Sequence, residues 1–335
     1  LDPRLIMYDP GNYGTPLELV DGLTVPNDLF FVRNNGPVPA ISPDEWRLLV
    51  TGLVDKQLEL SLADLKGMPQ QTFTAFLECS GNSRRFFQPN ASATQWGNTA
   101  VGNAEWVGIR LADVLNTVGV QDGAVDIVSQ GGDFPEMQRG LPLGTALAPD
   151  TMLVWQMNGE DLPPVHGGPV RLFVSGWGGI ASTKWLVGIE VIDHVFDGHF
   201  NSESYVITTE HEQIVRPVRE MPVKSVISTP AVGAQLSAGS QTIAGYAWSG
   251  YSGIDLVEVS TDGGRNWAEA EITEEAGRLS WVRFEYVWEA APTPGAAQLQ
   301  SRATDELGLT QPYEVAWNAK GYQYNAIFEV PVTVQ

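Results

Sequence analysis

The chain contains little of three things: cysteine, basic residues and long apolar stretches. Its single cysteine, Cys79, excludes an internal disulfide, a cysteine-rich zinc site, an iron–sulfur cluster and the two-thiol attachment of a c-type haem. Lys and Arg number 19 against 40 Asp and Glu, so the formal net charge is −21. A surface of that sign repels a phosphate backbone, and nucleic acid is therefore not expected as a partner.

No segment approaches the ~20 consecutive apolar residues that a membrane-spanning helix needs, so no membrane span is expected. Residues 1–10 also lack the basic segment and apolar core that are typical of a signal peptide. The excess of negative charge favours solubility, and it can also steer a basic partner toward the protein.

What the chain does contain is enough apolar material for two folded domains: 335 residues, 43% hydrophobic and 10% aromatic. The 35 glycines and 22 prolines are scattered, which favours short strands and loops. Apolar runs of strand length occur at residues 46–52, 71–77, 151–157 and 170–175. Helical spacing occurs at 61–66, where Ser61 can cap the helix, and at 110–118. The first part is therefore predicted to be mixed α+β.

The pattern changes near residue 223, after which no helical spacing is found. Strand-like runs recur at residues 226–229, 241–248, 255–260, 267–272, 281–288 and 299–304. Asp262-Gly263-Gly264 forms a hairpin turn signal between two of these runs. We expect an α+β domain over residues 1–223, followed by an all-β immunoglobulin-like sandwich over 224–335.

The most informative segment is residues 76–87, with the sequence FLECSGNSRRFF. It delivers Cys79 from a strand-like run into a polar, glycine-containing loop that continues to Arg84 and Arg85. Positive charge near a cysteine favours its thiolate form, which can act as a nucleophile or as a soft metal ligand. Composition alone leaves open a third interpretation, a buried structural cysteine that packs like a small apolar side chain.

The order of motifs along the chain resembles the sulfite oxidase family of molybdopterin enzymes, and most closely bacterial sulfite dehydrogenases without a haem domain. The matching segments lie at residues 31–39 (FVRNNGPVP), 79–82 (CSGN), 104–108 (AEWVG), 157–163 (MNGEDLP), 166–171 (HGGPVR), 184–186 (KWL), 221–225 (MPVKS), 245–250 (GYAWSG) and 260–264 (STDGG). They cover nearly the whole chain in the family's order, which makes the resemblance far more specific than one short motif.

The resemblance implies a molybdenum atom held by a single pyranopterin, molybdopterin, and by one protein thiolate, which is Cys79 by position. By the same match, the residues that hold the pterin and its phosphate are Phe31, Val32, Arg33, Asn34, Asn35, Asp133, His166, Arg171, Ser182, Thr183 and Lys184. The residue types suit this assignment, because Arg171 and Lys184 can bind a phosphate and Asp133 can accept hydrogen bonds from pterin N–H groups.

The resemblance also implies a substrate pocket, with the catalytic residues Arg33, Arg84, Tyr205, Lys320 and Trp96. For Trp96, plain core packing is nearly as good an interpretation. Four positions depart from the family pattern: Ser92 stands where the animal enzymes have a lysine, Asn35 replaces a histidine, and Ser83 and Lys320 each replace an arginine. Lysine keeps the positive charge but loses the two-pronged geometry of a guanidinium, so the anion that this pocket prefers stays open.

The activity implied is oxidation of sulfite to sulfate by oxygen-atom transfer. The chain has no cysteine pair for haem attachment, so the electrons are expected to pass to a separate acceptor, such as a c-type cytochrome. The resemblance further implies a homodimer that pairs through the second domain, and a periplasmic location.

Three alternatives stay open. One is the molybdenum subunit of a sulfane dehydrogenase in a thiosulfate-oxidising system. Another is a nitrate reductase-like domain, in which the position of Tyr205 is typically not tyrosine. The third is a cofactor-free binding module, and the joint presence of Cys79, Arg84, His166, Arg171 and Lys184 argues against it.

Overall fold

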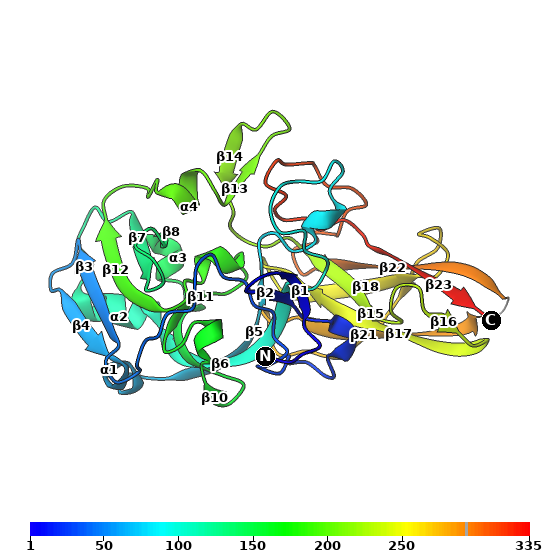
Figure 1. Ribbon diagram of the computed structural model, residues 1–335, viewed down its shortest axis with the longest axis horizontal. Helices are drawn as coiled ribbons and strands as arrows, with labels where there is room; N and C mark the ends of the chain where they lie inside the picture. Colours follow the sequence, from blue (N-terminus) through cyan, green and yellow to red (C-terminus); the bar gives the residue numbers. More distant parts are fainter. Residues whose placement is uncertain (292–293) are drawn as a thin grey trace.

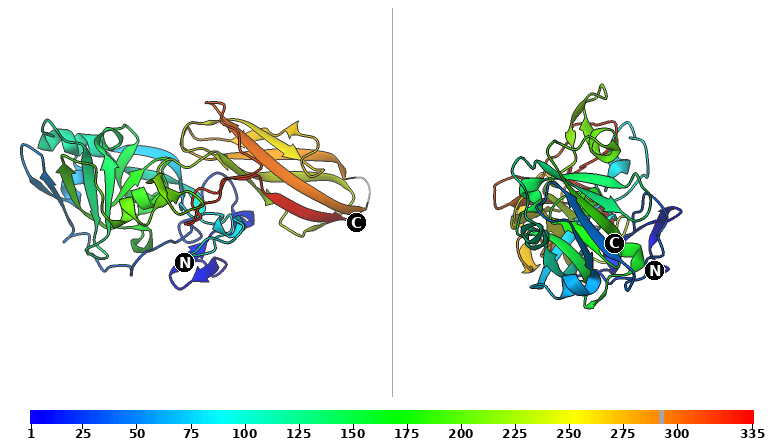
Figure 2. Two further views of the ribbon diagram at one scale, coloured as in Figure 1. Left: turned by 90° about the horizontal axis from the view of Figure 1, so that it is seen from above. Right: turned by 90° about the vertical axis from the view of Figure 1, so that its left-hand side faces the viewer.

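The computed structural model describes residues 1–291 and 294–335 as an elongated molecule with two lobes (Figures 1 and 2). The first lobe holds the strands up to β14, and the second holds those from β15 onward. Within the described residues, no helix is long and apolar enough to cross a membrane; the longest, α2, has 8 residues.

Two five-stranded sheets form the frame of the first lobe. One has the order β4 (Leu58–Ser61), β3 (Arg47–Gly52), β12 (Leu186–Ile192), β7 (Asp126–Gly131) and β8 (Gln138–Pro142). The other has the order β10 (Glu160–Asp161), β9 (Thr151–Met157), β6 (Val101–Arg110) and β5 (Gln71–Glu78), with β11 (Arg171–Val174) also paired to β9. Only β3 and β12 run parallel, while the other pairings in these sheets are antiparallel.

Short helices cover these sheets: α1 (Leu62–Lys66), α2 (Leu111–Val118), α3 (Leu143–Ala146) and α4 (His199–Ser202). α2 buries Leu111, Val114, Leu115 and Val118, the positions that share one helix face, in a core with Trp46. α1 begins at the predicted cap, because the Ser61 side chain accepts a hydrogen bond from the Asp64 N–H while the Asp64 carboxylate accepts one from the Ser61 N–H. Both predicted helices are therefore confirmed.

Smaller elements connect the sheets and carry the loops of the site. They are the strands β1 (Ile6–Asp9), β2 (Asn12–Gly14), β13 (Val206–Thr208) and β14 (Ile214–Pro217), and the 3-10 turns η1 (Leu17–Leu19), η2 (Arg84–Phe86), η3 (Pro164–His166) and η4 (Gly179–Ala181). The β13–β14 hairpin projects from the top of the molecule in Figure 1.

The second lobe is built from two sheets that share one core. The four-stranded sheet has the order β15 (Lys224–Thr229), β17 (Gly239–Trp248), β21 (Val282–Ala291) and β20 (Glu271–Glu274). The five-stranded sheet has the order β16 (Gln235–Leu236), β23 (Glu329–Val334), β22 (Gly295–Asp305), β18 (Ile254–Ser260) and β19 (Ala268–Glu269). Ile243 and Phe284 of the first sheet meet Val257, Leu299 and Val330 of the second in one buried cluster, so the sheets pack face to face.

The predicted hairpin at residues 262–264 is confirmed, because β18 and β19 run antiparallel on either side of it. The Asp262 carboxylate closes the turn by accepting hydrogen bonds from the N–H groups of Arg265 and Asn266, each at 3.0 Å. The strand predicted at 267–272 differs from the structure. It divides at buried Ala270 into β19 and β20, which belong to different sheets.

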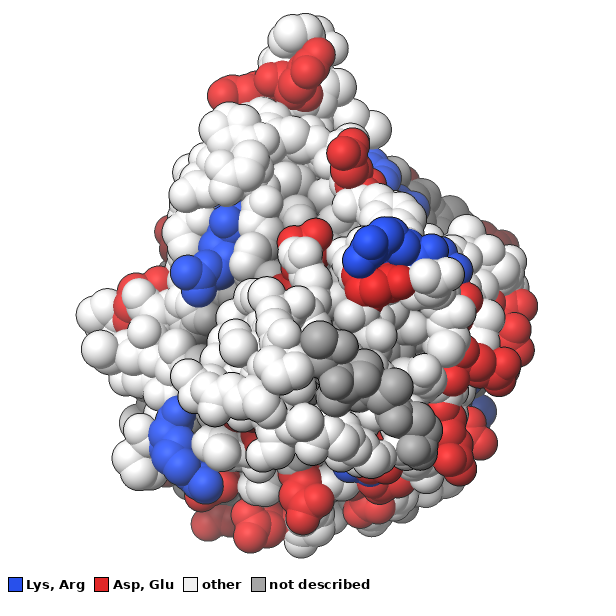
Figure 3. Space-filling view, turned by 90° about the vertical axis from the view of Figure 1, so that its right-hand side faces the viewer, with Lys and Arg blue, Asp and Glu red and all other residues white. Residues whose placement is uncertain are grey.

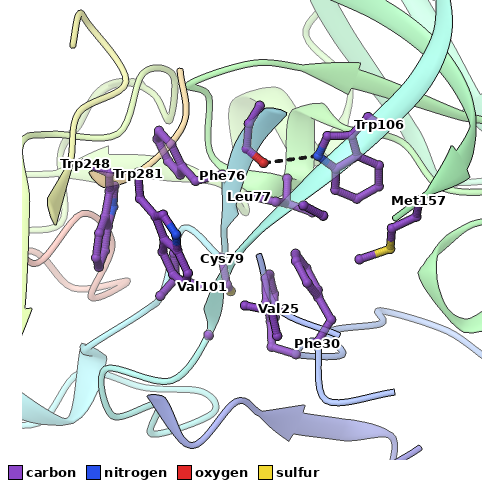
Figure 4. Close-up of a cluster of buried hydrophobic side chains, with 14 of the residues drawn as sticks. Val25, Phe30, Phe76, Leu77, Cys79, Val101, Trp106, Met157, Trp248 and Trp281 are labelled. Carbon is purple, nitrogen blue, oxygen red and sulfur yellow. Dashed lines mark hydrogen bonds between the residues drawn. The ribbon is translucent and has the colours of Figure 1, made fainter. Parts of the chain in front are cut away.

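The two lobes are joined through an aromatic cluster and a buried ion pair. Phe76 on β5 packs against Trp248 of the second lobe, beside Trp281, and Cys79 follows in the same cluster (Figure 4). The carboxylate of Glu78 accepts a hydrogen bond from the indole N–H of Trp248 at 2.8 Å and pairs with the Lys224 ammonium at 3.4 Å. The second lobe therefore contacts the strand that leads directly into the Cys79 loop.

Candidate functional site

A pocket of about 690 Å³, measured with its open mouth, lies where the loops of the first lobe converge. It is lined by Phe30, Phe31, Arg33, Asn34, Asn35, Leu77, Cys79, Ser80, Asp133, Met137, His166, Arg171, Gly179, Ile180, Ser182, Thr183, Lys184, Trp185 and Tyr205. These residues come from the segment after β2, the end of β5, the β7–β8 connection, the η3–β11 segment, the segment from η4 to β12, and the residue before β13.

Cys79 reaches the pocket because β5 ends one residue before it. Its N–H donates to the carbonyl of Ala100 at 2.9 Å, and its carbonyl accepts from the N–H of Asn82 at 2.8 Å. The Asn82 side chain braces the loop, donating to Glu78 at 2.9 Å and accepting from the Ala100 N–H at 3.0 Å. The loop is thus fixed on both sides, and it holds a free thiol that is 7% exposed.

The pocket also gathers positive charge, because Arg33, Arg171 and Lys184 all line it. The Lys184 ammonium donates to the Asn34 side chain at 2.6 Å and to the Val165 carbonyl at 2.7 Å. Burial lowers the pKa of Lys184 well below its ordinary value, and the charges of Arg171 and Arg33 lower it further. Burial also lowers the pKa of Arg171 to about 9. Such a cluster is costly by itself and is relieved by an anion bound among the three cations.

Three buried polar atoms of pocket residues have no hydrogen-bond partner among the described residues: Ser80 Oγ, Asp133 Oδ1 and Arg171 Nε. Buried polar atoms are almost always paired in folded proteins. The Arg171 Nε donor and the Asp133 Oδ1 acceptor together fit a ligand that has both phosphate oxygens and N–H groups. The residues present therefore fit a phosphate-bearing pterin.

His166 adds an acceptor to this set. Burial lowers its pKa to about 3, and the positive charge of Lys184 lowers it further. The ring is therefore neutral at physiological pH. Its Nε2 lies 2.8 Å from the carbonyl of Asn27, which can only accept, so Nε2 carries the proton. The lone pair of Nδ1 remains as a hydrogen-bond acceptor.

Arg33, Asn35 and Tyr205 form a connected group at the pocket. The Asn35 side-chain oxygen accepts from the Arg33 guanidinium at 2.7 Å and from the Tyr205 hydroxyl at 3.2 Å. Arg33 also donates to the carbonyl of Asn34. A single amide oxygen thus sets the positions of a cation and a phenol, the two kinds of donor that suit an oxyanion.

The structure brings most of the predicted residues to the pocket: Phe31, Arg33, Asn34, Asn35, Cys79, Asp133, His166, Arg171, Ser182, Thr183, Lys184 and Tyr205. Four others, Val32, Arg84, Trp96 and Lys320, are not part of the lining in the described chain. Val32 bridges to Tyr13 through its backbone, and Trp96 is fully buried against Tyr8, with the ring centroids 4.6 Å apart.

Arg84 is buried and is not part of the pocket lining, where the sequence predicted it. Its guanidinium donates to the carbonyls of Lys320 and Thr94, at 3.0 Å each. It also lies close to Gly81, where a Cβ atom would come within 2.4 Å of the guanidinium. The main chain of Lys320 therefore holds Arg84 in place.

The sequence did not point to several lining residues: Phe30, Leu77, Ser80, Met137, Gly179, Ile180 and Trp185. Ser80 could have been found, because it follows Cys79 within the matching loop. Met137 lies in an irregular connection and Ile180 in the three-residue turn η4, and no spacing pattern marks either residue.

Comparison with known proteins agrees with this geometry. The family described as "Oxidoreductase molybdopterin binding domain" matches residues 35–200, and "Mo-co oxidoreductase dimerisation domain" matches residues 200–335. The sulfite oxidase of Arabidopsis thaliana is 32% identical over 90% of this chain and 86% of its own length. The mitochondrial sulfite oxidase of Drosophila melanogaster is 34% identical over 97% of this chain, which spans only 62% of that relative.

Among solved structures, the sulfane dehydrogenase SoxCD from Paracoccus pantotrophus is similar, with a TM-score of 0.89 and 30% identity. The match covers 97% of this chain and 85% of that one. The likeness therefore extends through both lobes, as do the two family matches. The chain belongs to the sulfite oxidase family of molybdopterin oxidoreductases.

Proposed function

We propose that the protein oxidises sulfite to sulfate by oxygen-atom transfer, with molybdenum held by one molybdopterin and by Cys79. The observation that carries this proposal is the pocket itself, where a free thiol, one buried and two partly exposed cations and unpaired polar atoms meet. The bound molybdenum centre would supply the oxygen-atom transfer and two-electron redox chemistry.

The residues of the pocket divide the work of holding the cofactor. The Cys79 thiolate is the soft donor that would ligate molybdenum. Arg171 and Lys184 would bind the phosphate, joined by the hydroxyls of Ser182 and Thr183. The Asp133 carboxylate and Nδ1 of His166 would accept hydrogen bonds from N–H groups of the pterin. The Phe31–Asn35 segment would cover the pterin.

Arg33 and Tyr205 would bind the substrate oxyanion, the first through charge and the second through its hydroxyl. Their shared contact with Asn35 fixes both donors before the substrate arrives, which lowers the reorganisation that the reaction requires. Arg84, Trp96 and Lys320 remain proposed members of the wider site. Arg84 is buried outside the lining, with its guanidinium carbon 4.9 Å from the ring centroid of Tyr322, and would add positive charge near the pocket.

A second candidate is a sulfane dehydrogenase, as suggested by the likeness to the structure from Paracoccus pantotrophus. A pocket whose lining offers Arg33 and a phenol to the substrate, rather than several arginines, also suits a sulfur group that is less charged than sulfite. Parallel assays with sulfite, thiosulfate and nitrate separate these functions. The cations that line the pocket argue against a cofactor-free binding module, because Arg33, Arg171 and Lys184 would then have no bound anion among them.

We further propose a homodimer that pairs through the second lobe, supported by the match of residues 200–335 to a dimerisation domain. The fold of that lobe suggests an immunoglobulin-like sandwich, with the domain boundary between residues 223 and 224. The acceptor would be a separate c-type cytochrome, and the location periplasmic. Figure 3 views the outer end of the second lobe, where acidic side chains are widely spread and basic ones form a few separate groups.

The test is Cys79→Ser, together with elemental analysis for molybdenum. We expect the wild-type protein to contain molybdenum and to reduce ferricyanide or cytochrome c with sulfite. We expect the variant to lose turnover, because an alcohol is a poorer soft-metal donor than a thiolate, while its circular dichroism stays unchanged. Sulfite oxidation that persists in the variant would contradict the assignment of Cys79 as the molybdenum ligand. A fully matured wild-type protein without molybdenum would contradict the proposal that the protein is a molybdenum enzyme.

A further inference from the structure

A loop of the second lobe, residues 318–323, reaches back to the pocket of the first lobe. The N–H of Gln323 donates to the carbonyl of Ser80 at 2.9 Å, directly after Cys79. The N–H of Ala319 donates to the Thr208 hydroxyl at 3.0 Å, on the strand that follows Tyr205. In Figure 1 this loop runs beside the segment that follows Cys79, above the junction of the lobes. It therefore touches both sides of the proposed substrate site.

Tyr322 is the residue of this loop whose side chain stacks on Tyr205, a residue of the pocket lining. Its backbone is fixed by Asn318, whose side chain donates to the Tyr322 carbonyl and accepts from its N–H, at 3.0 Å each. The preceding Gly321 has φ +62°, and a Cβ atom there would lie 2.7 Å from the Arg84 side chain. Glycine thus permits the close approach that places Tyr322, and the side chain is only 8% exposed.

The ring of Tyr322 contacts two proposed site residues at once. It stacks on the ring of Tyr205, with centroids 5.2 Å apart and planes at 16°. The guanidinium carbon of Arg84 lies 4.9 Å from the centroid of the Tyr322 ring. Tyr205 and Tyr322 also share a buried cluster with Met137 and Ile180, two residues that line the pocket. Tyr322 therefore supports the pocket wall from behind.

The stack matters because the hydroxyl of Tyr205 has only one hydrogen bond among the described residues, the 3.2 Å contact with Asn35. A single long hydrogen bond leaves a phenol ring free to tilt. The stacked ring of Tyr322 removes that freedom together with Phe200, whose ring centroid lies 5.8 Å from that of Tyr205, and Asn35 transmits the position of Tyr205 to Arg33. The contacts thus form a chain from Tyr322 through Tyr205 and Asn35 to Arg33.

We propose that Tyr322 is a positioning residue, which orients the Tyr205 hydroxyl and, through Asn35, the Arg33 guanidinium toward the substrate oxyanion. The inference rests on the proposed function of the pocket. It assigns the second lobe a part in substrate binding within the same chain, through an aromatic ring rather than a cation. The ring, and not its hydroxyl, carries the effect.

The test compares variants of the holoenzyme by kcat and KM for sulfite and by the Kd for sulfate, the product anion, measured without turnover. Tyr322→Leu should raise the KM and the sulfate Kd at least about tenfold, because a misplaced donor no longer meets the anion. Tyr322→Phe keeps the stack and should stay within about twofold of wild type. Tyr322→Met, which fills the space without a ring, should resemble Tyr322→Leu and replaces it if the leucine variant fails to fold.

Tyr324→Leu is the matched control. Tyr324 belongs to the same part of the chain but packs against Phe87, with centroids 4.9 Å apart, and should leave both constants unchanged. The variant Tyr205→Phe, combined with Tyr322→Leu, should lose less than the sum of the single losses, because both changes act on one hydroxyl.

Wild-type constants in a folded Tyr322→Leu or Tyr322→Met variant would overturn the proposal, as would an equal loss in Tyr324→Leu or additive losses in the double variant. If the wild-type protein binds sulfate but does not oxidise sulfite, only the proposed activity is overturned. The role of Tyr322 is then still decided by comparing the sulfate Kd of the variants with that of the wild type. Wild-type protein that does neither would overturn both.

Discussion

At the scale of single residues, His166 illustrates how burial decides charge. Its pKa is lowered to about 3 by burial and by Lys184, while the unfolded chain binds a proton near the ordinary value of 6.5. Between these two values the unfolded state holds the proton and the folded state does not. Above pH 6.5 His166 is unprotonated in both states and does not affect the free energy of unfolding. As the pH falls from 6.5 toward 3, His166 lowers the free energy of unfolding by about 1.4 kcal/mol per pH unit.

We predict that His166→Gln removes this part of the acid sensitivity. Glutamine has a side-chain N–H for the Asn27 carbonyl but does not titrate. The measurement is urea unfolding near neutral pH and at about pH 4.5, where the stability of the wild type should have fallen by about 2–3 kcal/mol more than that of the variant. His211→Gln, at an exposed position, is the control and should retain the wild-type slope. An equal slope in wild type and His166→Gln would contradict the prediction.

Single residues also show where sequence reasoning ends. Motif matches predicted that Arg33, Cys79 and Lys184 lie together, and all three line one pocket. The matches did not predict where the Arg84 side chain points. Ser83, the residue before it, has a left-handed backbone conformation, and the Arg84 guanidinium donates to the main-chain carbonyl of Lys320. Tyr322 was missed because a lone aromatic residue in a loop has no periodic pattern. Its role depends on contacts between segments that lie far apart in the sequence.

At the scale of elements, periodicity predicted the regular parts well. The helix at α2 and most strands of the second lobe follow from spacing alone. β23 was missed, since Pro331 lies inside it and proline argues against a strand. The structure accommodates this proline because β16 pairs with β23 only at Thr333 and Val334, so no partner on that side needs an N–H from Pro331.

The ion pair between β5 and β15 leads to a prediction at the same scale. Glu78 and Lys224 are both buried, with side-chain exposures of 1% and 3%. Lys224→Met should destabilise the protein by about 3–5 kcal/mol, because it leaves a carboxylate buried without its counter-charge. Urea unfolding measures the change. The double variant Glu78→Gln/Lys224→Met should recover part of the loss, since glutamine can still accept from the Trp248 N–H without a charge.

A partly exposed ion pair within the second lobe, between Arg302 and Glu258, serves as the control for Lys224→Met. Arg302 and Glu258 lie 2.6 Å apart, with side-chain exposures of 26% and 20%. Because solvent screens this pair, Arg302→Met should lower the free energy of unfolding by no more than about 1 kcal/mol. If Lys224→Met costs no more than this control, or if the double variant is less stable than the single one, the buried pair does not hold the lobes together as inferred.

At the scale of the whole molecule, positive and negative charge are separated. The cations Arg33, Arg171 and Lys184 lie in the pocket, while the chain has a net charge of −21 and acidic side chains are widely spread over the face seen in Figure 3. This separation suits the proposed function, in which a small anion enters the pocket and a large basic acceptor binds at the surface. Charges of opposite sign on two proteins raise the rate of encounter, and salt screens that attraction.

We therefore predict that kcat/KM for a basic cytochrome c falls by about tenfold when ionic strength rises from about 0.01 M to about 0.2 M. With ferricyanide, a small anion repelled by the same surface, the rate should stay level or rise. Both acceptors draw electrons from the same centre, so a difference between them reports the encounter and not the oxidation of sulfite. Stopped-flow reduction of the cytochrome at saturating sulfite measures this step directly. Equal salt dependence for the two acceptors would assign the acidic surface to solubility alone.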